Sequence, residues 1–204
     1  MGIKKVLGIE VEQDPQKEWV FLSQKKFAEH ILQKLGMEHC NPAPTPALPN
    51  FKLSKSMCPK NDDEKEAIRH ETIDYRSAAC SLLFLTHTHP ELCYPVSQVA
   101  KFVQNPGKEH FQALKRILRY VQGHKHFGLL FKKPVNEDVV LTAFCDADWA
   151  GGVDDKRSTT GHVCMINGNV VSFKSKHQAS VALSSCEAET TALCSAAQEI
   201  AWLR

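Results

Sequence analysis

Two pairs of carboxylates stand out as residues that could do chemistry. Asp146 and Asp148 follow a stretch rich in β-branched residues, and Glu187 and Glu189 come roughly forty residues later, near the start of an expected helix. A strand-borne Asp facing a helix-borne Glu forms half of a cage for divalent cations, because hard cations such as Mg²⁺ bind oxygen ligands and two such ions about 4 Å apart commonly drive phosphodiester cleavage. Acidic residues at strand and helix ends are also common as solvated groups or caps, so the pattern alone leaves both interpretations open.

Cationic side chains are concentrated in the stretch from residue 101 to residue 133. Eight lysines or arginines, Arg116 among them, lie there against a single acid. Lys108, Lys115 and Arg119 fall roughly on one face of an expected helix, opposite large apolar residues. Such a row of cations can follow the phosphate backbone of a nucleic acid, and it can equally be the solvated face of an amphipathic helix. Spacing alone does not choose between the two.

Three further patterns have weaker chemical meaning. Arg116-Ile117-Leu118-Arg119 spells the R-x-L-R string of translocated effector proteins, but its two central residues suit a helix core, so we expect no effector role. His162 and His177 have no cysteine or second histidine at a metal-ligand spacing, which favours ordinary satisfied histidines. The eight cysteines include no C-x-x-C pair, and we interpret them as reduced thiols used as small core side chains.

Periodicity and turn signals predict the elements that position these residues. A strand at 7–11, a turn at 13–16 and a return strand at 19–22 precede a helix from Ser23 to Leu35. Prolines and a charged run predict an extended, exposed connector over 41–70. The remaining pattern predicts helices over 75–88, 91–104 and 108–122, a strand over 139–144, a hairpin of 161–166 and 170–173, and a helix from Ser184 to Arg204.

Bulk composition excludes several classes of protein. With 204 residues, of which 43% are hydrophobic and 24% charged, the chain suits one ordinary domain or two small ones rather than a disordered protein. The net charge of +2 says little about partners, because the distribution of charge matters more than its sum. The first twelve residues lack a long apolar core, and no apolar run of about 18 residues occurs. We therefore expect an intracellular protein, cytoplasmic or nuclear, with neither a signal peptide nor a membrane span.

Long ordered motifs give the chain a resemblance to the C-terminal part of copia-type retrotransposon Pol polyproteins. The motifs are YRSAACSLLFLTHTHPELCYPVSQVAKF, NPGKEHFQALKRILRYVQGHKHFGLLF, CDADWAGGVDDKRSTTGHV and SFKSKHQASVALSSCEAETTALCSAAQEIAWLR. The earlier LGIEVEQD, FLSQKKFAEHILQKLGM and NPAPTPAL resemble the family's segment just after the polymerase palm. The resemblance implies the end of a reverse transcriptase palm and thumb at 1–40, a linker at 41–70, a helical thumb and connection at 71–134, and a truncated ribonuclease H-like domain at 138–204.

The fold class that follows is α/β in the broad sense, or α+β. A helical region precedes an incomplete ribonuclease H-like fold of three antiparallel strands and one helix. Only part of that sheet would be covered, so we expect an unpaired strand edge on which an isolated chain is prone to associate.

The resemblance also assigns site residues. It implies catalytic and metal-binding roles for Asp146, in the Asp-Ala-Asp-Trp motif, and for Glu189, the second acid of Glu-Ala-Glu. The complete family domain is expected to bind Mg²⁺ or Mn²⁺. The family uses further carboxylates beyond the last helix, and its paired polymerase aspartates have no counterpart here, since Val153-Asp154-Asp155 belongs to the ribonuclease H motif. Whether the chain is an enzyme is therefore open, and we expect no measurable activity from these residues alone.

The resemblance implies two partners, an RNA–DNA hybrid and the remainder of a Pol polyprotein. Lys156, Arg157, Lys174 and Lys176 resemble family turns and strand ends at which cations can face a phosphate backbone, although ordinary solvated cations fit them equally well. The resemblance favours binding for the row at 108–119. An alternative is a domesticated or decayed remnant that binds nucleic acid or protein without catalysis, since Cys80, His89 and Thr190 depart from the family's usual residues.

Overall fold

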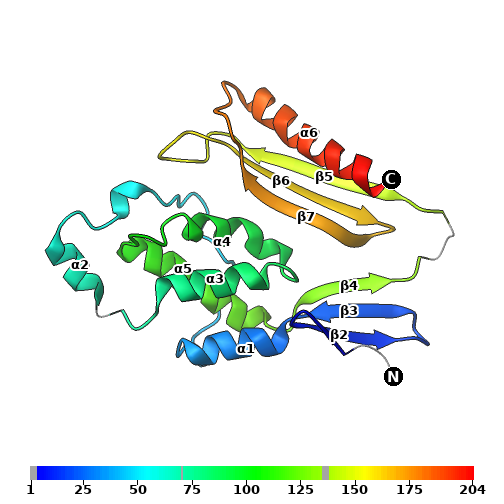
Figure 1. Cartoon of the computed structure of the whole chain (residues 1–204), viewed down its shortest axis with the longest axis horizontal. Coiled ribbons are helices and arrows are strands. Elements are labelled where there is room, and N and C mark those ends of the chain that lie inside the picture. Colours follow the sequence, from blue (N-terminus) through cyan, green and yellow to red (C-terminus); the bar gives the residue numbers. More distant parts are fainter. Residues whose placement is uncertain (1–3, 70, 135–137) are drawn as a thin grey trace. The chain divides into compact units, whose positions relative to one another are not determined.

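The computed structural model describes residues 4–69, 71–134 and 138–204 (Figure 1). Residues 1–3 lie outside these ranges, and they belong to the N-terminal segment that we expect to lack a signal peptide. His70 of the expected connector lies outside them too. The chain divides into two compact units, one formed by Met1–Ser23 with Gly128–Arg204 and the other by Gln24–Phe127. The predicted limits at residues 40, 70 and 134 concern segments of a polyprotein rather than compact units, and they stay predictions.

The α+β fold class is confirmed. The described residues form six α-helices and two antiparallel sheets, one of four strands and one of three. The unit Gln24–Phe127 is helical. Its elements are α1 (Lys25–Lys34), η1 (Lys55–Met57), α2 (Asp62–Arg69), α3 (Tyr75–Leu85), η2 (Pro90–Leu92), α4 (Cys93–Ala100) and α5 (Lys108–His124).

The core of the helical unit lies among α1, α3, α4 and α5. Leu32, Leu82, Val96 and Leu118 come from these four helices in turn, and each is almost completely buried. The three helices predicted after residue 75 are confirmed, although α3 and α4 are shorter than expected. Asp74 explains why α3 begins where it does, because its carboxylate accepts hydrogen bonds from two backbone N–H groups of the first turn.

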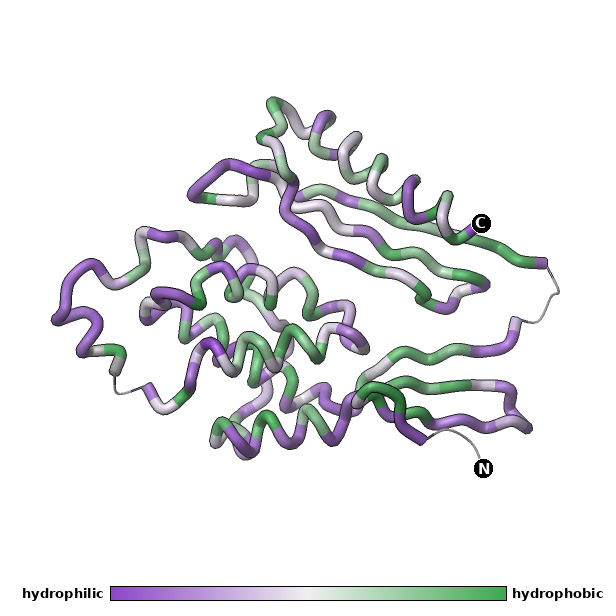
Figure 2. Tube along the Cα trace, in the orientation of Figure 1, coloured by the Kyte–Doolittle hydropathy of each residue, from purple (hydrophilic) through white to green (hydrophobic). Residues whose placement is uncertain are grey.

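The segment 41–70 is not an extended connector throughout, as the prolines had suggested. It contains η1 and α2, and Ala43 is only 2% exposed. Polar contacts to α5 hold its first part, because the backbone N–H of Ala43 donates to the carbonyl oxygen of Arg119 at 3.2 Å. Figure 2 shows α2 mainly in the hydrophilic colour, as its run of acidic residues requires.

The other unit contains a four-stranded sheet in the order β1-β2-β3-β4. Its strands are β1 (Lys5–Val6), β2 (Ile9–Asp14), β3 (Trp19–Ser23) and β4 (Gly128–Lys132). The strand predicted at 7–11 was wrong in its limits, because Leu7 and Gly8 adopt positive φ angles and form a turn. The predicted turn at 13–16 is displaced toward the C-terminus, because β2 continues to Asp14, which pairs with Trp19. Ser23 was expected to cap α1, but it pairs with Gly128 as the last residue of β3.

A three-stranded antiparallel sheet and one helix complete this unit. The order is β5-β6-β7, formed by β5 (Leu141–Asp148), β6 (Thr159–Ile166) and β7 (Asn169–His177), and α6 (Ser185–Leu203) lies along one face of the sheet (Figure 1). The hairpin across Asn167 and Gly168 is confirmed, since both residues have the positive φ angles of a tight hairpin turn. The helix predicted from Ser184 is confirmed as well, and the Ser184 side chain accepts a hydrogen bond from the backbone N–H of Glu187.

Candidate functional site

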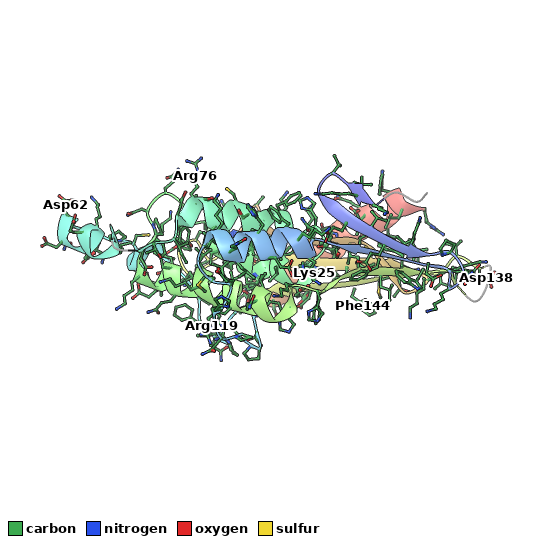
Figure 3. The ribbon with its side chains drawn as sticks, turned by 90° about the horizontal axis from the view of Figure 1, so that it is seen from below. Lys25, Asp62, Arg76, Arg119, Asp138 and Phe144 are labelled. Atoms are coloured by element: carbon green, nitrogen blue, oxygen red, sulfur yellow. The ribbon has the colours of Figure 1, made fainter. Side chains whose placement is uncertain are left out.

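Asp146 lies inside strand β5, which continues four residues beyond the predicted strand at 139–144. It pairs with Gly161 of β6, and Gly161 pairs with Ser175 of β7. Side chains alternate between the two faces of a strand, so Asp146 shares its face with Phe144. Both side chains are exposed, and Phe144 can be followed in Figure 3.

Helix α6 covers the opposite face of this sheet. Thr160 accepts a hydrogen bond from Gln178 Nε2 at 3.0 Å, and the same nitrogen donates to the carbonyl oxygen of Ala188 on α6 at 2.9 Å. Thr160 pairs with Ala147, the neighbour of Asp146 in β5. Because neighbours along a strand point to opposite faces, Asp146 is directed away from α6.

Glu189 lies in the second turn of α6, immediately after Ala188, which is completely buried against the sheet. Ser184 and Glu187 together fix the start of this helix, since the Glu187 carboxylate accepts the backbone N–H of Leu183 at 2.8 Å. The Glu187 carboxylate is therefore occupied in capping. Glu189 itself is exposed and, among the described residues, has no hydrogen-bond or ion-pair partner.

Carboxylate oxygens suit Mg²⁺ or Mn²⁺, but the arrangement does not by itself assemble a metal site. Within residues 4–69, 71–134 and 138–204, no three His, Cys, Asp or Glu side chains are grouped so that they could hold a metal ion. Asp148 packs against the turn instead: a Cβ at Gly151 would lie 1.9 Å from Asp148 Oδ2. Asp146 and Glu189 belong to one unit, but Asp146 is directed away from α6, the helix that carries Glu189, so the described residues do not bring the two carboxylates face to face. Their roles as metal ligands stay predictions.

Four predicted cations lie at or near one end of the three-stranded sheet. Asp148 pairs with Thr159 and Thr159 with His177, so the end of β5, the start of β6 and the end of β7 are adjacent. The turn before β6 joins them, because Asp155 Oδ1 lies 3.6 Å from His177 Nε2. This turn carries Lys156 and Arg157, and the end of β7 carries Lys174 and Lys176. All four of these cations are exposed.

The predicted cations of α5 lie in the helical unit, and three of the four are occupied. Lys115 Nζ contacts Glu71 Oε2 at 2.6 Å, and Arg116 donates to Thr45 Oγ1 at 2.8 Å. Arg119 Nε donates to the carbonyl oxygen of Asn41 at 2.7 Å, and its side chain can be followed in Figure 3. Lys108, the first residue of α5, is exposed. These arginines therefore have a structural task in holding residues 41–45 against α5.

His162 is the residue whose surroundings the sequence predicted wrongly. It lies in β6 under α6, only 4% exposed, and neither ring nitrogen has a hydrogen-bond partner among the described residues. The prediction that His162 is an ordinary histidine with hydrogen-bonded ring nitrogens is therefore wrong. Burial lowers the pKa of His162, Glu199 on α6 opposes this shift, and Lys174 on β7 adds to it. No local sequence signal marks such a residue, because its burial depends on the docking of α6.

Comparison with known proteins places the chain among transposon sequences. It is 36% identical to the retrovirus-related Pol polyprotein from transposon TNT 1-94 of Nicotiana tabacum over 202 residues. This aligned region covers 98% of this chain but only 15% of that polyprotein. It is 39% identical over 196 residues to the uncharacterized mitochondrial protein AtMg00810 of Arabidopsis thaliana, covering 96% of this chain and 76% of that protein. A third relative is the secreted RxLR effector protein 161 of Plasmopara viticola, at 42% identity over 65% of this chain and 93% of that protein.

No known family profile matches the chain, and no solved structure matches it. The fold defines an α+β protein in which exposed cations lie at one end of a three-stranded sheet, and a helix covers one face of that sheet. At about 35% identity over nearly its whole length, the chain is homologous to copia-type retrotransposon Pol polyproteins. It spans 15% of the length of the tobacco polyprotein. Of the helices in the described ranges, none has the length and apolar character required to cross a bilayer.

Proposed function

We propose that this chain is the part of a copia-type Pol protein that grips an RNA–DNA hybrid beside an incomplete ribonuclease H site. The observation that carries the proposal is that Lys156 and Arg157, on the turn before β6, and Lys174 and Lys176, near the end of the adjacent strand β7, are all exposed at one end of the sheet. Exposed cations at this end attract a phosphate backbone.

The two carboxylates have a different part in the proposal. Asp146 and Glu189 offer oxygen ligands of the kind that Mg²⁺ or Mn²⁺ prefers, and neither is engaged by another residue in the described part of the chain. A two-metal hydrolysis needs more ligands than these two side chains supply. We therefore assign the missing carboxylates to the remainder of the Pol polyprotein, the second partner of this chain, and expect the chain alone to bind without cutting.

Binding is tested with a fluorescently labelled RNA–DNA hybrid by anisotropy over a series of salt concentrations. Replacement of all four cations, Lys156, Arg157, Lys174 and Lys176, by Ala should reduce the slope of log affinity against log salt by about 3 to 4, since each lost phosphate contact removes about 0.9. The matched control removes four lysines in or beside the strands of the four-stranded sheet, namely Lys4, Lys5, Lys17 and Lys133. Equal weakening by the control would show that only net charge matters, and the proposed grip would be wrong.

Cleavage is tested on the same hybrid with Mg²⁺ or Mn²⁺. We expect intact RNA after incubation with the unaltered chain and with Asp146→Asn or Glu189→Gln, and equal binding by all three proteins. Cleavage by the unaltered chain that both substitutions abolish would mean that another carboxylate or a second chain completes the site. The division of labour proposed above would then be refuted.

A second candidate is a domesticated or decayed remnant that binds nucleic acid or protein without any catalytic partner. The observation that favours it is that the chain covers 76% and 93% of two short relatives, so this segment also occurs largely without the rest of a Pol protein. Unchanged biological function after Asp146→Asn in the host would support this candidate over the first. The R-x-L-R string does not support a secreted effector role, because its central residues Ile117 and Leu118 are 1% and 0% exposed in the core of the helical unit.

A further inference from the structure

Residues 41–45 lie against the second half of α5 and engage two of its arginines; we call this segment the strap. Arg116 Nη2 donates to Thr45 Oγ1 at 2.8 Å, and Arg119 Nε donates to the carbonyl oxygen of Asn41 at 2.7 Å. Both arginines are half-buried. The strap therefore occupies two cations that would otherwise be open to a partner on this face of the helix.

The strap occupies these arginines without neutralising them. Its acceptors are a hydroxyl and a backbone carbonyl, and neither arginine forms an ion pair with a carboxylate among the described residues. Lys115 differs, because its Nζ lies 2.6 Å from Glu71 Oε2. Arg116 Nε is buried and has no acceptor in the described part of the chain. A phosphate can accept two parallel hydrogen bonds from one guanidinium, so it is a stronger partner for Arg116 than the Thr45 hydroxyl is.

The strap itself buries little surface. Ala43 is 2% exposed, whereas the other four residues of the strap are exposed. Pro42 and Pro44 have no backbone N–H to donate, and the N–H of Ala43 donates to the carbonyl oxygen of Arg119 at 3.2 Å. Because so little apolar surface is buried, opening the strap costs much less free energy than unfolding the helical core.

We propose that the strap is a replaceable cover, which the phosphate backbone of a nucleic acid displaces when it binds Arg116 and Arg119. In the closed state the strap competes with phosphate for the same two guanidinium groups. In the open state these groups join the exposed Lys108 on α5. The proposal shares with the proposed function only its partner, the RNA–DNA hybrid, because its cations belong to the helical unit and not to the three-stranded sheet.

A reversible disulfide provides the test. A Cβ added to Gly123 of α5 would lie 3.1 Å from Pro42 Cβ. Disulfides join Cβ atoms about 3.5 to 4.5 Å apart, so the exposed Pro42 needs to move by only about 0.4 Å. Pro42→Cys combined with Gly123→Cys, with Cys40→Ser to prevent mispairing, should lock the strap on oxidation and release it on reduction. Mass spectrometry verifies the bond, and circular dichroism verifies the fold.

Fluorescence anisotropy with the labelled RNA–DNA hybrid compares the locked and the reduced protein over a series of salt concentrations. The reduced protein should bind more tightly, with a slope of log affinity against log salt steeper by about 2, since each of two phosphate contacts contributes about 0.9. Arg116→Ala with Arg119→Ala should abolish this difference. Lys25→Ala with Arg76→Ala, two exposed cations of the same unit labelled in Figure 3, should preserve it. Pro42→Cys alone should not respond to reduction.

Two outcomes would overturn the proposal. Equal affinity and salt slope for the locked and reduced protein, including no binding by either, would leave the strap as a structural brace alone. A difference that persists without both arginines would mean that the lock acts through other groups. The grip proposed for the cations of the three-stranded sheet is assessed separately, because replacing those cations leaves the difference between locked and reduced protein in place.

Discussion

Replacing His162 by Leu should remove a pH dependence from the stability of the unit that contains the two sheets. The imidazole is buried beneath α6, and neither nitrogen forms a hydrogen bond with a described residue. Three groups from the surrounding elements face it: Glu199 on α6 and Lys174 on β7 act on its charge, and Cys145 pairs with it from β5. A charged imidazole in this position would be poorly solvated, so the folded protein favours the neutral ring.

The magnitude follows from the difference in protonation between the folded and unfolded states. Burial lowers the pKa of His162 in the folded state, whereas the unfolded chain has the ordinary value of about 6.5. Unfolding therefore takes up a proton when the pH lies between the two values. The stabilising contribution is fully present above about pH 6.5, and it is lost by at most about 1.4 kcal/mol for each pH unit as the pH falls toward the folded-state pKa.

Tryptophan fluorescence gives the assay, because all three tryptophans, Trp19, Trp149 and Trp202, belong to this unit. Urea unfolding is measured at pH 7.5, 6.5 and 5.5. Between pH 6.5 and 5.5, His162→Leu should lose less free energy of unfolding than the unaltered chain, by at most about 1.4 kcal/mol. His126→Gln, at an exposed position, should follow the unaltered chain. Parallel curves for all three proteins would mean that His162 is not the group that couples acid to unfolding, and the reasoning from its burial would be refuted.

Three further predictions concern the packing that supports the site. Leu118→Ala should destabilise the helical unit by about 2 to 5 kcal/mol in urea unfolding, because Leu118 is fully buried. Leu83→Ala should cost far less, because that side chain is 42% exposed. Similar urea midpoints for the two variants would contradict the assignment of Leu118 to the core. Ser184→Ala should lower stability by about 1 kcal/mol through loss of the α6 cap, with Ser185→Ala as the near-neutral control in the same helix. Asn169→Ala should increase amide exchange at Lys132, which loses its hydrogen bond to the Asn169 side chain, and unchanged exchange would show that the contact is absent in solution.

The sequence by itself determined the elements whose signals are local. The helix from Ser184 and the hairpin at Asn167 and Gly168 depend on residues within a few positions of one another, and both agree with the structure. Cap residues and positive φ angles act over such distances, so the sequence contains the whole argument. Local signals pointed only to two pairs of acids, and the family resemblance selected Asp146 and Glu189 from them. Their roles in binding metal or nucleic acid remain predictions.

Only the tertiary structure decided which distant segments meet. β3 pairs with β4, and more than one hundred residues separate the two strands in the sequence. No pattern in Gly128–Lys132 predicts that this strand pairs with β3. In the sequence, nothing distinguishes Arg116 and Arg119 from solvated cations, yet in the structure they donate hydrogen bonds to Thr45 and Asn41. His162 is buried because α6 covers its face of the sheet. Partners of this kind are chosen by long-range burial and hydrogen bonding across the whole chain, which short-range patterns do not record.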